Sequence, residues 1–225
     1  MNAFQSAWAW LTQPQQWLGP DGIPARLVQH LEYTGIAVAV AALIALPLGL
    51  LIGHTGRGSL VIVTLANLGR ALPTLGLVVL AFLISNGSPA AVLVALVVLA
   101  IPPILVDTYE GVRGVDPDVK DAARGMGMTA GQTLLRAEIP MAMPLILLGL
   151  RTAAIQIVAT ATIAAYIGLG GLGRYIIDGL SEDNYAMVAG GAVVVVALAL
   201  AVQVVFAGIR RLAVPAGIRQ QAQAS

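Results

Sequence analysis

The sequence predicts an all-α, polytopic integral membrane protein with about five transmembrane helices. Hydrophobic residues make up 58% of its 225 positions, charged residues make up 10%, and the mean hydropathy is +0.88. A soluble domain carries about 25% charged residues, and a chain of this length could not enclose so much apolar surface. Disordered chains are polar and strongly charged, so this composition excludes them too. Lipid is left as the environment for these side chains, at about 20 apolar residues for each helix that crosses the bilayer.

Runs without charge locate the expected spans. The first lies between Glu32 and Arg57. Residues 71–106 carry no charge and are too many for one helix, and the turn-forming residues at 85–89 divide them between two spans. The expected spans are residues 33–52, 60–84, 90–109, 144–166 and 185–206, with Arg70 inside the second and Arg151 inside the fourth.

Lysine and arginine gather on one side of the expected membrane. The loops of the opposite side hold only Arg26 and Arg174. Cytoplasmic loops keep the excess of basic residues. We therefore expect a bacterial plasma membrane protein with its N-terminus outside the cell and its C-terminus in the cytoplasm. We expect no signal peptide, since the first 18 residues lack a basic start and a long apolar run. The basic residues of the cytoplasmic side are Arg57, Arg113, Lys120, Arg124, Arg136, Arg210, Arg211 and Arg219.

We expect a single membrane domain over residues 28–209. Residues 1–27 form an N-terminal segment with all three tryptophans, Trp8, Trp10 and Trp17. Tryptophans favour the membrane interface, which predicts an amphipathic stretch at the outer face; a flexible tail is the alternative. Residues 210–225 form a cytoplasmic tail.

The one long connection, residues 116–140, is predicted to form two short helices. Asp116 and Pro117 are a helix start, with an acid as N-cap and proline in the first position. Thr129 and Gln132 have the spacing of a capping box that opens the second helix. Glycines separate the two helices, and we expect Pro140 to end the second one. We call residues 116–140 the elbow. Its two helices are capped and carry apolar residues, so we expect the elbow to dock into a groove of another protein; a solvated loop is the alternative.

The elbow resembles the cytoplasmic loop motif of binding-protein-dependent ABC transporter permeases, written E-A-A, three residues, G, nine residues, I-x-L-P. Asp121 replaces the usual Glu, and Ala137 stands where Ile is usual. The resemblance implies a type I ABC importer permease fold in which the elbow contacts an ATPase. The residues that it assigns to ATPase coupling are Asp121, Ala122, Ala123, Gly127, Met128, Leu134, Ile139 and Pro140.

The resemblance also implies partners and excludes catalysis by the chain itself. It implies a second permease subunit (another copy or a close relative), two cytoplasmic ATPase subunits that bind ATP, and an extracytoplasmic substrate-binding protein. The chain has no P-loop motif of its own, so we expect no bound cofactor. With no cysteine and only the isolated His30 and His54, no metal site is expected. The net charge of +1 predicts no nucleic-acid partner.

A glycine-rich segment follows the fourth span, within residues 167–184. It matches G-x-G-x-x-G, but a dinucleotide site needs a preceding strand, whereas here a span precedes it. We expect a turn across the outer mouth, an outer gate. Residues 160–180 also resemble permeases of osmoprotectant importers for glycine betaine, choline and related compounds, with methionine-importer permeases as the nearest competitor. The outer-gate residues are Gly168, Gly170, Gly171, Gly173 and Tyr175.

Polar residues within spans are candidates for the translocation pathway, because they are costly in lipid. These are Gln156, Thr160, Thr162 and Tyr166. Structural pairing between helices is the alternative, and for the charges Arg70, Asp107 and Arg151 both roles stay open. Tyr166, Tyr175 and Tyr185 are expected near the outer mouth, where they could touch a passing cation or belong to an interfacial belt.

The expected function is the transmembrane pathway of an ATP-driven importer of osmoprotectants such as glycine betaine, choline, carnitine or proline betaine. One alternative is a permease for methionine or another amino acid. The other is a secondary transporter that needs no ATPase, which would lead us to expect an ion-coupling acid and an inverted repeat.

Overall fold

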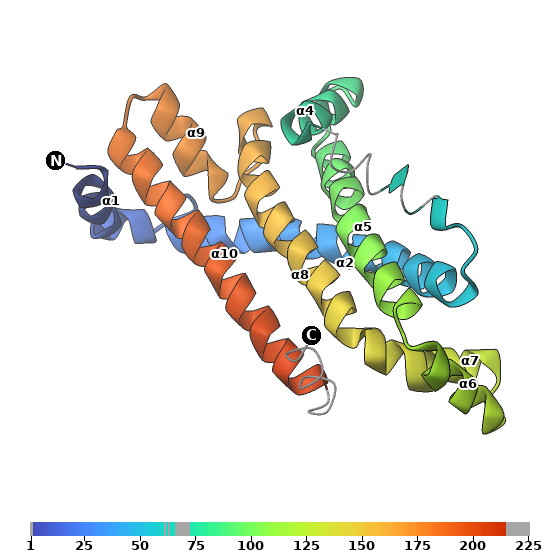
Figure 1. Cartoon of the computed structure of the whole chain (residues 1–225). Coiled ribbons are helices and arrows are strands. Elements are labelled where there is room, and N and C mark those ends of the chain that lie inside the picture. The colour runs from blue at the N-terminus through green and yellow to red at the C-terminus, as the bar shows by residue number, and fades with distance from the viewer. Residues whose placement is uncertain (1, 61, 63, 66–72, 215–225) are drawn as a thin grey trace. The chain divides into compact units, whose positions relative to one another are not determined.

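The computed structural model describes residues 2–60, 62, 64–65 and 73–214, and these residues contain helices and no strand. Figure 1 shows the helices in chain order. Their bounds are α1 Ala3–Leu11, η1 Pro14–Trp17, α2 Ile23–Thr55, α4 Thr74–Ile84, α5 Pro89–Arg113, α6 Pro117–Gly125, α7 Ala130–Thr133, η2 Leu134–Glu138, α8 Ile139–Ala164, η3 Ala165–Ile167, α9 Gly173–Ser181 and α10 Tyr185–Ala213.

Four of the expected spans are confirmed as helices long and apolar enough to cross a membrane: α2, α5, the continuous run Ala130–Ile167 and α10. Each is longer than its charge-free run, because helices continue into the polar boundary. Of the expected span at residues 60–84, the described end is α4, which has 11 residues and starts after Pro73. Arg70 and residues 66–72 lie outside the described residues, as does the tail after Val214.

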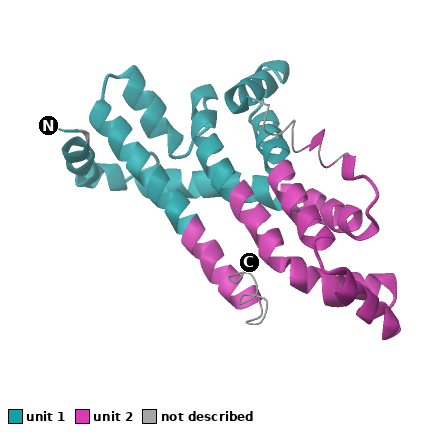
Figure 2. Ribbon diagram, in the orientation of Figure 1, with its two compact units in different colours: residues 1–39, 72–100, 154–202 teal, residues 40–71, 101–153, 203–225 magenta. Residues whose placement is uncertain are grey.

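The chain divides into two compact units, coloured separately in Figure 2. Unit 1 comprises residues 1–39, 72–100 and 154–202, and unit 2 comprises residues 40–71, 101–153 and 203–225. Each unit has a hydrophobic core of its own.

The core of unit 1 contains Trp10, which is only 4% exposed. Its ring meets that of Tyr175 edge to face, with the centroids 5.1 Å apart. Helix α1 begins with a capping box between Asn2 and Gln5. Trp8 and Trp17 are exposed, whereas Trp10 is a core residue, so α1 packs onto the core of unit 1 through one of the three tryptophans. The other core residues are Ile23, Val158, Leu172 and Leu198.

Glycines hold the helices of unit 2 at close range. A Cβ on Gly49 would lie 2.8 Å from Cβ of Thr108, and a Cβ on Gly53 would lie 2.8 Å from Cβ of Val112, so α2 lies directly on α5. A Cβ on Gly149 of α8 would lie 2.8 Å from the carbonyl oxygen of Pro103 on α5. Small residues permit this packing, which stabilises helix pairs where lipid offers no hydrophobic driving force.

Candidate functional site

Both helices of the elbow start at the predicted caps. The Asp116 carboxylate accepts a hydrogen bond of 2.9 Å from the backbone N–H of Asp118, with Pro117 in the first turn of α6. Thr129 and Gln132 form both bonds of the capping box that opens α7. Gly127, at a φ of +81°, makes the bend between them. Figure 1 shows α6 and α7 between the end of α5 and the start of α8. The two predicted helix starts and the bend between them are therefore confirmed.

The expectation that Pro140 ends the second helix is wrong. Helix α7 continues through η2, a π-helical turn, directly into α8, in which Pro140 is the second residue. The backbone N–H of Ile139 bonds to the carbonyl of Leu134, five residues earlier. Proline clashes with the carbonyl four residues before it in a regular α-helix. The wider π turn changes the hydrogen-bonding register just before the proline, so the helix passes through without a break.

The elbow presents some of the predicted coupling residues to solvent and buries others. Asp121, Ala122 and Gly127 are exposed, and so are Met126 and Leu135, whose exposed fractions are 72% and 67%. The inward residues are Ala123, which is buried, and Leu134 and Ile139, which pack against Val112, Ala142 and Ile146. Met128 and Pro140 are partly buried. The first group forms an outward surface, and the second attaches the elbow to its own bundle.

Glu138 is a buried acid that the sequence analysis did not single out. Its side chain is 1% exposed. Its Oε2 accepts a hydrogen bond of 2.7 Å from Nδ1 of His54, at the end of α2, and its Oε1 lies 3.9 Å from Nζ of Lys120 on α6. Lys120 also donates to the carbonyl of Val112 over 3.1 Å. One carboxylate thus joins three elements of unit 2: α2, α6 and the π turn.

Three of the four predicted pathway residues form hydrogen bonds to backbone carbonyls. Thr160 is 4% exposed, and its hydroxyl donates to the carbonyl of Gln156 over 2.9 Å. Gln156 reaches the carbonyl of Leu99 at 3.5 Å. Thr162 is partly exposed and donates to the carbonyl of Ala159. Tyr166 is 67% exposed and is therefore the most accessible of the four.

The glycine segment turns the chain after α8 and contacts the start of α2. Gly168 and Gly171 have φ angles of +88° and +87°, which only glycine adopts without strain. The backbone N–H of Gly171 donates to Oε1 of Gln29 over 3.1 Å, and His30 lies against the same glycine. A Cβ on Gly170 would also overlap Gln29, and one on Gly173 would overlap the carbonyl of Thr162. The chain therefore turns at these glycines after α8, and the positive φ angles and close contacts explain why the turn needs glycine.

Tyr175 is buried, whereas Tyr166 and Tyr185 are exposed. Its hydroxyl donates to the carbonyl of Asp21 over 2.6 Å, and its ring is 4% exposed, whereas Tyr166 and Tyr185 are each 67% exposed. Burial raises the pKa of Tyr175 to about 12. Of the three tyrosines expected near the outer mouth, Tyr175 is thus the one whose ring packs in the core with Trp10 and is not exposed to a passing cation.

The described residues offer no metal site, since no three His, Cys, Asp or Glu side chains gather among them. Asp107 lies at the contact of α5 with Gly149. Among the residues that the structure describes, neither Asp107 nor Arg151 forms an ion pair, so the two charges are not paired with each other.

Comparison with known proteins assigns the chain to a family. Residues 45–216 match the model described as "Binding-protein-dependent transport system inner membrane component". The chain is 34% identical over 192 residues to the choline transport system permease protein OpuBB of Bacillus subtilis (strain 168), covering 85% of this chain and 88% of the relative. It is 33% identical over 197 residues to the glycine betaine/carnitine/choline transport system permease protein OpuCB of the same strain, covering 88% and 91%.

A solved structure has the same fold. A chain of the MetNI methionine ABC transporter, in inward-facing conformations, superposes with a TM-score of 0.76 at 22% identity, covering 91% of this chain and all of that one. The match of the family model over most of the length, the two relatives and the shared fold agree with the elbow motif. The chain belongs to the family of binding-protein-dependent transport system inner membrane components, the permeases of ABC importers.

Proposed function

We propose that this chain is the transmembrane pathway subunit of an ATP-driven importer of osmoprotectants such as glycine betaine, choline, carnitine or proline betaine. The observation that carries the proposal is its identity of 33–34% to two permeases named for choline, glycine betaine and carnitine, over at least 85% of the chain. The methionine transporter shares the fold at 22% identity, a level that supports the architecture but no substrate.

Uptake by the complete transporter tests the substrate. Cells that lack their own uptake systems would express the chain with its ATPase and its binding protein, and would receive labelled choline, glycine betaine, carnitine or methionine. We expect uptake of at least one quaternary ammonium compound and none of methionine, with no uptake when the ATPase cannot hydrolyse ATP. Methionine uptake alone would contradict the proposed substrate class, and uptake without the ATPase would contradict the transporter class.

The proposed site of ATPase contact is the outward surface of the elbow, formed by Asp121, Ala122, Met126, Gly127 and Leu135. Exposed apolar side chains on a capped, rigid support favour docking into a groove. Aspartate and glycine at their motif positions support the same assignment. The chain itself would not be catalytic; two cytoplasmic ATPase subunits would bind and hydrolyse ATP.

Movement of the elbow would reach the membrane helices by two connections. The first is the continuous helix from α7 into α8. The second is the buried Glu138, which holds His54 of α2 and Lys120 of α6. Elements joined in this way move together, so closure of the ATPases would reposition α2 and α8 between inward-open and outward-open states.

The remaining parts of the proposal concern partners and orientation. The membrane domain, residues 28–209, would pair with a second permease subunit. The outer gate at 167–184 and the segment 1–27 would face the outside, where a binding protein delivers substrate. The elbow at 116–140 and the tail at 210–225 would face the cytoplasm, in agreement with their basic residues. Within the spans, Gln156, Thr160, Thr162 and Tyr166 stay the proposed pathway residues, Tyr166 being the most exposed.

A further inference from the structure

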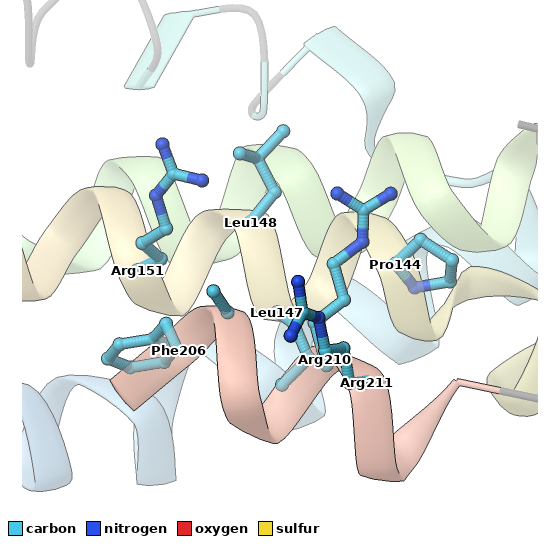
Figure 3. Close-up of a pocket in the computed structure, with 8 residues that line it drawn as sticks. Pro144, Leu147, Leu148, Arg151, Phe206, Arg210 and Arg211 are labelled. Carbon is cyan, nitrogen blue, oxygen red and sulfur yellow. The ribbon is translucent and has the colours of Figure 1, made fainter. Parts of the chain in front are cut away.

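Unit 2 contains a hollow of about 350 Å³ between α8 and α10, drawn in Figure 3. Its apolar lining includes Leu147 and Leu148 of α8 and Phe206 of α10. Three arginines also line it, Arg151 from α8 and Arg210 and Arg211 from α10. No acidic side chain is among the described residues of the lining. The hollow therefore combines an apolar wall with a concentration of positive charge.

Arg151 lies within the hydrophobic span of α8. An arginine at the centre of a membrane helix costs about 2.5–3.5 kcal/mol on insertion scales unless it gains a partner. Its guanidinium forms no hydrogen bond or ion pair with the part of the chain that the structure describes. An anion in the hollow would supply the missing partner.

The position along α10 puts this charge near the membrane surface. Arg210 follows Tyr185 by 25 residues, which is ~38 Å of helix, more than the ~30 Å of the hydrocarbon core. Arg210 and Arg211 therefore lie at the level of the lipid headgroups. Phe206, one turn earlier, is ~6 Å deeper. Figure 3 shows Arg151 at the Phe206 end of the hollow and Arg210 and Arg211 at the Pro144 end.

We infer that this hollow binds an anionic phospholipid. The arginines hold the phosphate, and an acyl chain lies along Leu147, Leu148 and Phe206. Basic pockets between membrane helices recognise anionic headgroups, and each cation near the headgroup contributes measurably to binding. A zwitterionic lipid has no net charge to match the three guanidinium groups. The inference needs only a membrane-embedded chain and does not depend on the transported substrate.

Native mass spectrometry of the purified full chain tests this site. The chain, freed of lipid in detergent, would receive equal amounts of phosphatidylglycerol and phosphatidylcholine with identical oleoyl chains. We expect phosphatidylglycerol to bind preferentially. Arg151→Gln and Arg210→Gln should each weaken its binding about fivefold, the effect expected from removing one cation beside an anionic headgroup. The matched control is Arg57→Gln, an exposed arginine that does not line the hollow, which should bind lipid like the wild type.

Arg210 is exposed, so Arg210→Gln keeps the test valid if Arg151→Gln fails to fold. Three results would overturn the inference. Equal binding of the two lipids would remove the charge selectivity. Competition by inorganic phosphate alone, at the same concentration, would indicate a phosphate site. Lipid binding unchanged in both variants, with weakened association of two copies of the chain, would make the hollow a subunit interface.

Discussion

Nδ1 of His54 lies 2.7 Å from Oε2 of Glu138, two residues 84 positions apart in the sequence. Carboxylates only accept hydrogen bonds, so this nitrogen carries the proton and donates it. Glu138 is almost completely buried, and the ammonium group of Lys120 is its second neighbour. The contact attaches the π turn that precedes α8 to the end of α2.

Replacing Glu138 with alanine should destabilise the protein and uncouple transport. The change leaves His54 and Lys120 beside a buried space without their carboxylate, a loss of about 3–5 kcal/mol for a buried pair. We expect the thermal unfolding midpoint in detergent to fall by about 6–20 °C. The more conservative Glu138→Gln should fold but import less substrate per ATP hydrolysed. Asp118→Asn removes an exposed acid from the same elbow and should cost less than about 1 kcal/mol.

Glycine at positions 49 and 53 should be required for contact between α2 and α5. Gly53→Val places methyl groups where Val112 already lies, an overpacking that costs about 1–3 kcal/mol. The thermal unfolding midpoint and the yield of folded protein would both fall. Gly35→Ala is the matched control, because it lies in the same helix with no atom within 4 Å of an added Cβ. A normal unfolding midpoint for Gly53→Val would contradict the described packing.

The hydroxyl of Tyr175 should ionise at a higher pH than that of an exposed tyrosine. The free energy of unfolding should therefore depend on pH in the alkaline range. Burial raises its pKa to about 12, above the value of about 10 in the unfolded chain. The stability that it contributes is therefore complete below pH ~10 and is lost as the pH rises towards about 12. The difference in phenolate absorbance between wild type and Tyr175→Phe should have its midpoint there. Tyr175→Phe keeps the ring against Trp10 and should lose about 1 kcal/mol with the Asp21 bond.

Charge on the outward surface of the elbow should block ATPase binding without unfolding the chain. Met126→Glu and Leu135→Glu each change an exposed apolar side chain that contributes little to the core. We expect at least a tenfold loss of ATPase in co-purification, as for a central interface residue, and a matching loss of uptake. Leu18→Glu alters an equally exposed leucine outside the elbow and should leave the ATPase bound. Normal co-purification of both elbow variants would refute the proposed docking surface.

Single cysteines should report the orientation in the membrane, because the natural sequence has none. With the N-terminus outside, an impermeant maleimide added to intact cells should label Ser181→Cys, an exposed position within the outer gate segment. It should reach Thr129→Cys, on the elbow, only after the membrane is opened. The reverse pattern would place the elbow outside, and no cytoplasmic ATPase could then contact it.

Local patterns predicted much of this fold and of the candidate site. Long apolar runs indicated the membrane helices, and the Asp116 and Thr129 caps and the Gly127 bend appear where the spacing predicted them. These features depend on residues close together in the chain, so periodicity and capping rules are sufficient to find them.

The features that were missed depend on contacts between distant segments. Nothing near His54 indicates that Glu138 will be its partner, and nothing near Trp10 indicates Tyr175. One available signal was Glu138 itself, a charge beside the apolar start of the fourth span. Pro140 was misjudged for a different reason: the rule that proline ends a helix assumes a regular α-helix before it, and here a π turn precedes it.

That π turn lets the chain fit one more residue between α7 and α8. A π turn accommodates about one residue more than an α turn for the same full rotation, whereas one residue of a regular α-helix corresponds to about 100° of rotation about the helix axis. Deleting a single residue between Leu134 and Glu138 would therefore restore the regular ladder and leave α7 facing nearly the same way around α8. The same deletion in the regular part of α8 would instead turn the whole elbow by about 100°, so the π turn is the one place on this long helix where a change of length leaves the azimuth of the elbow unchanged.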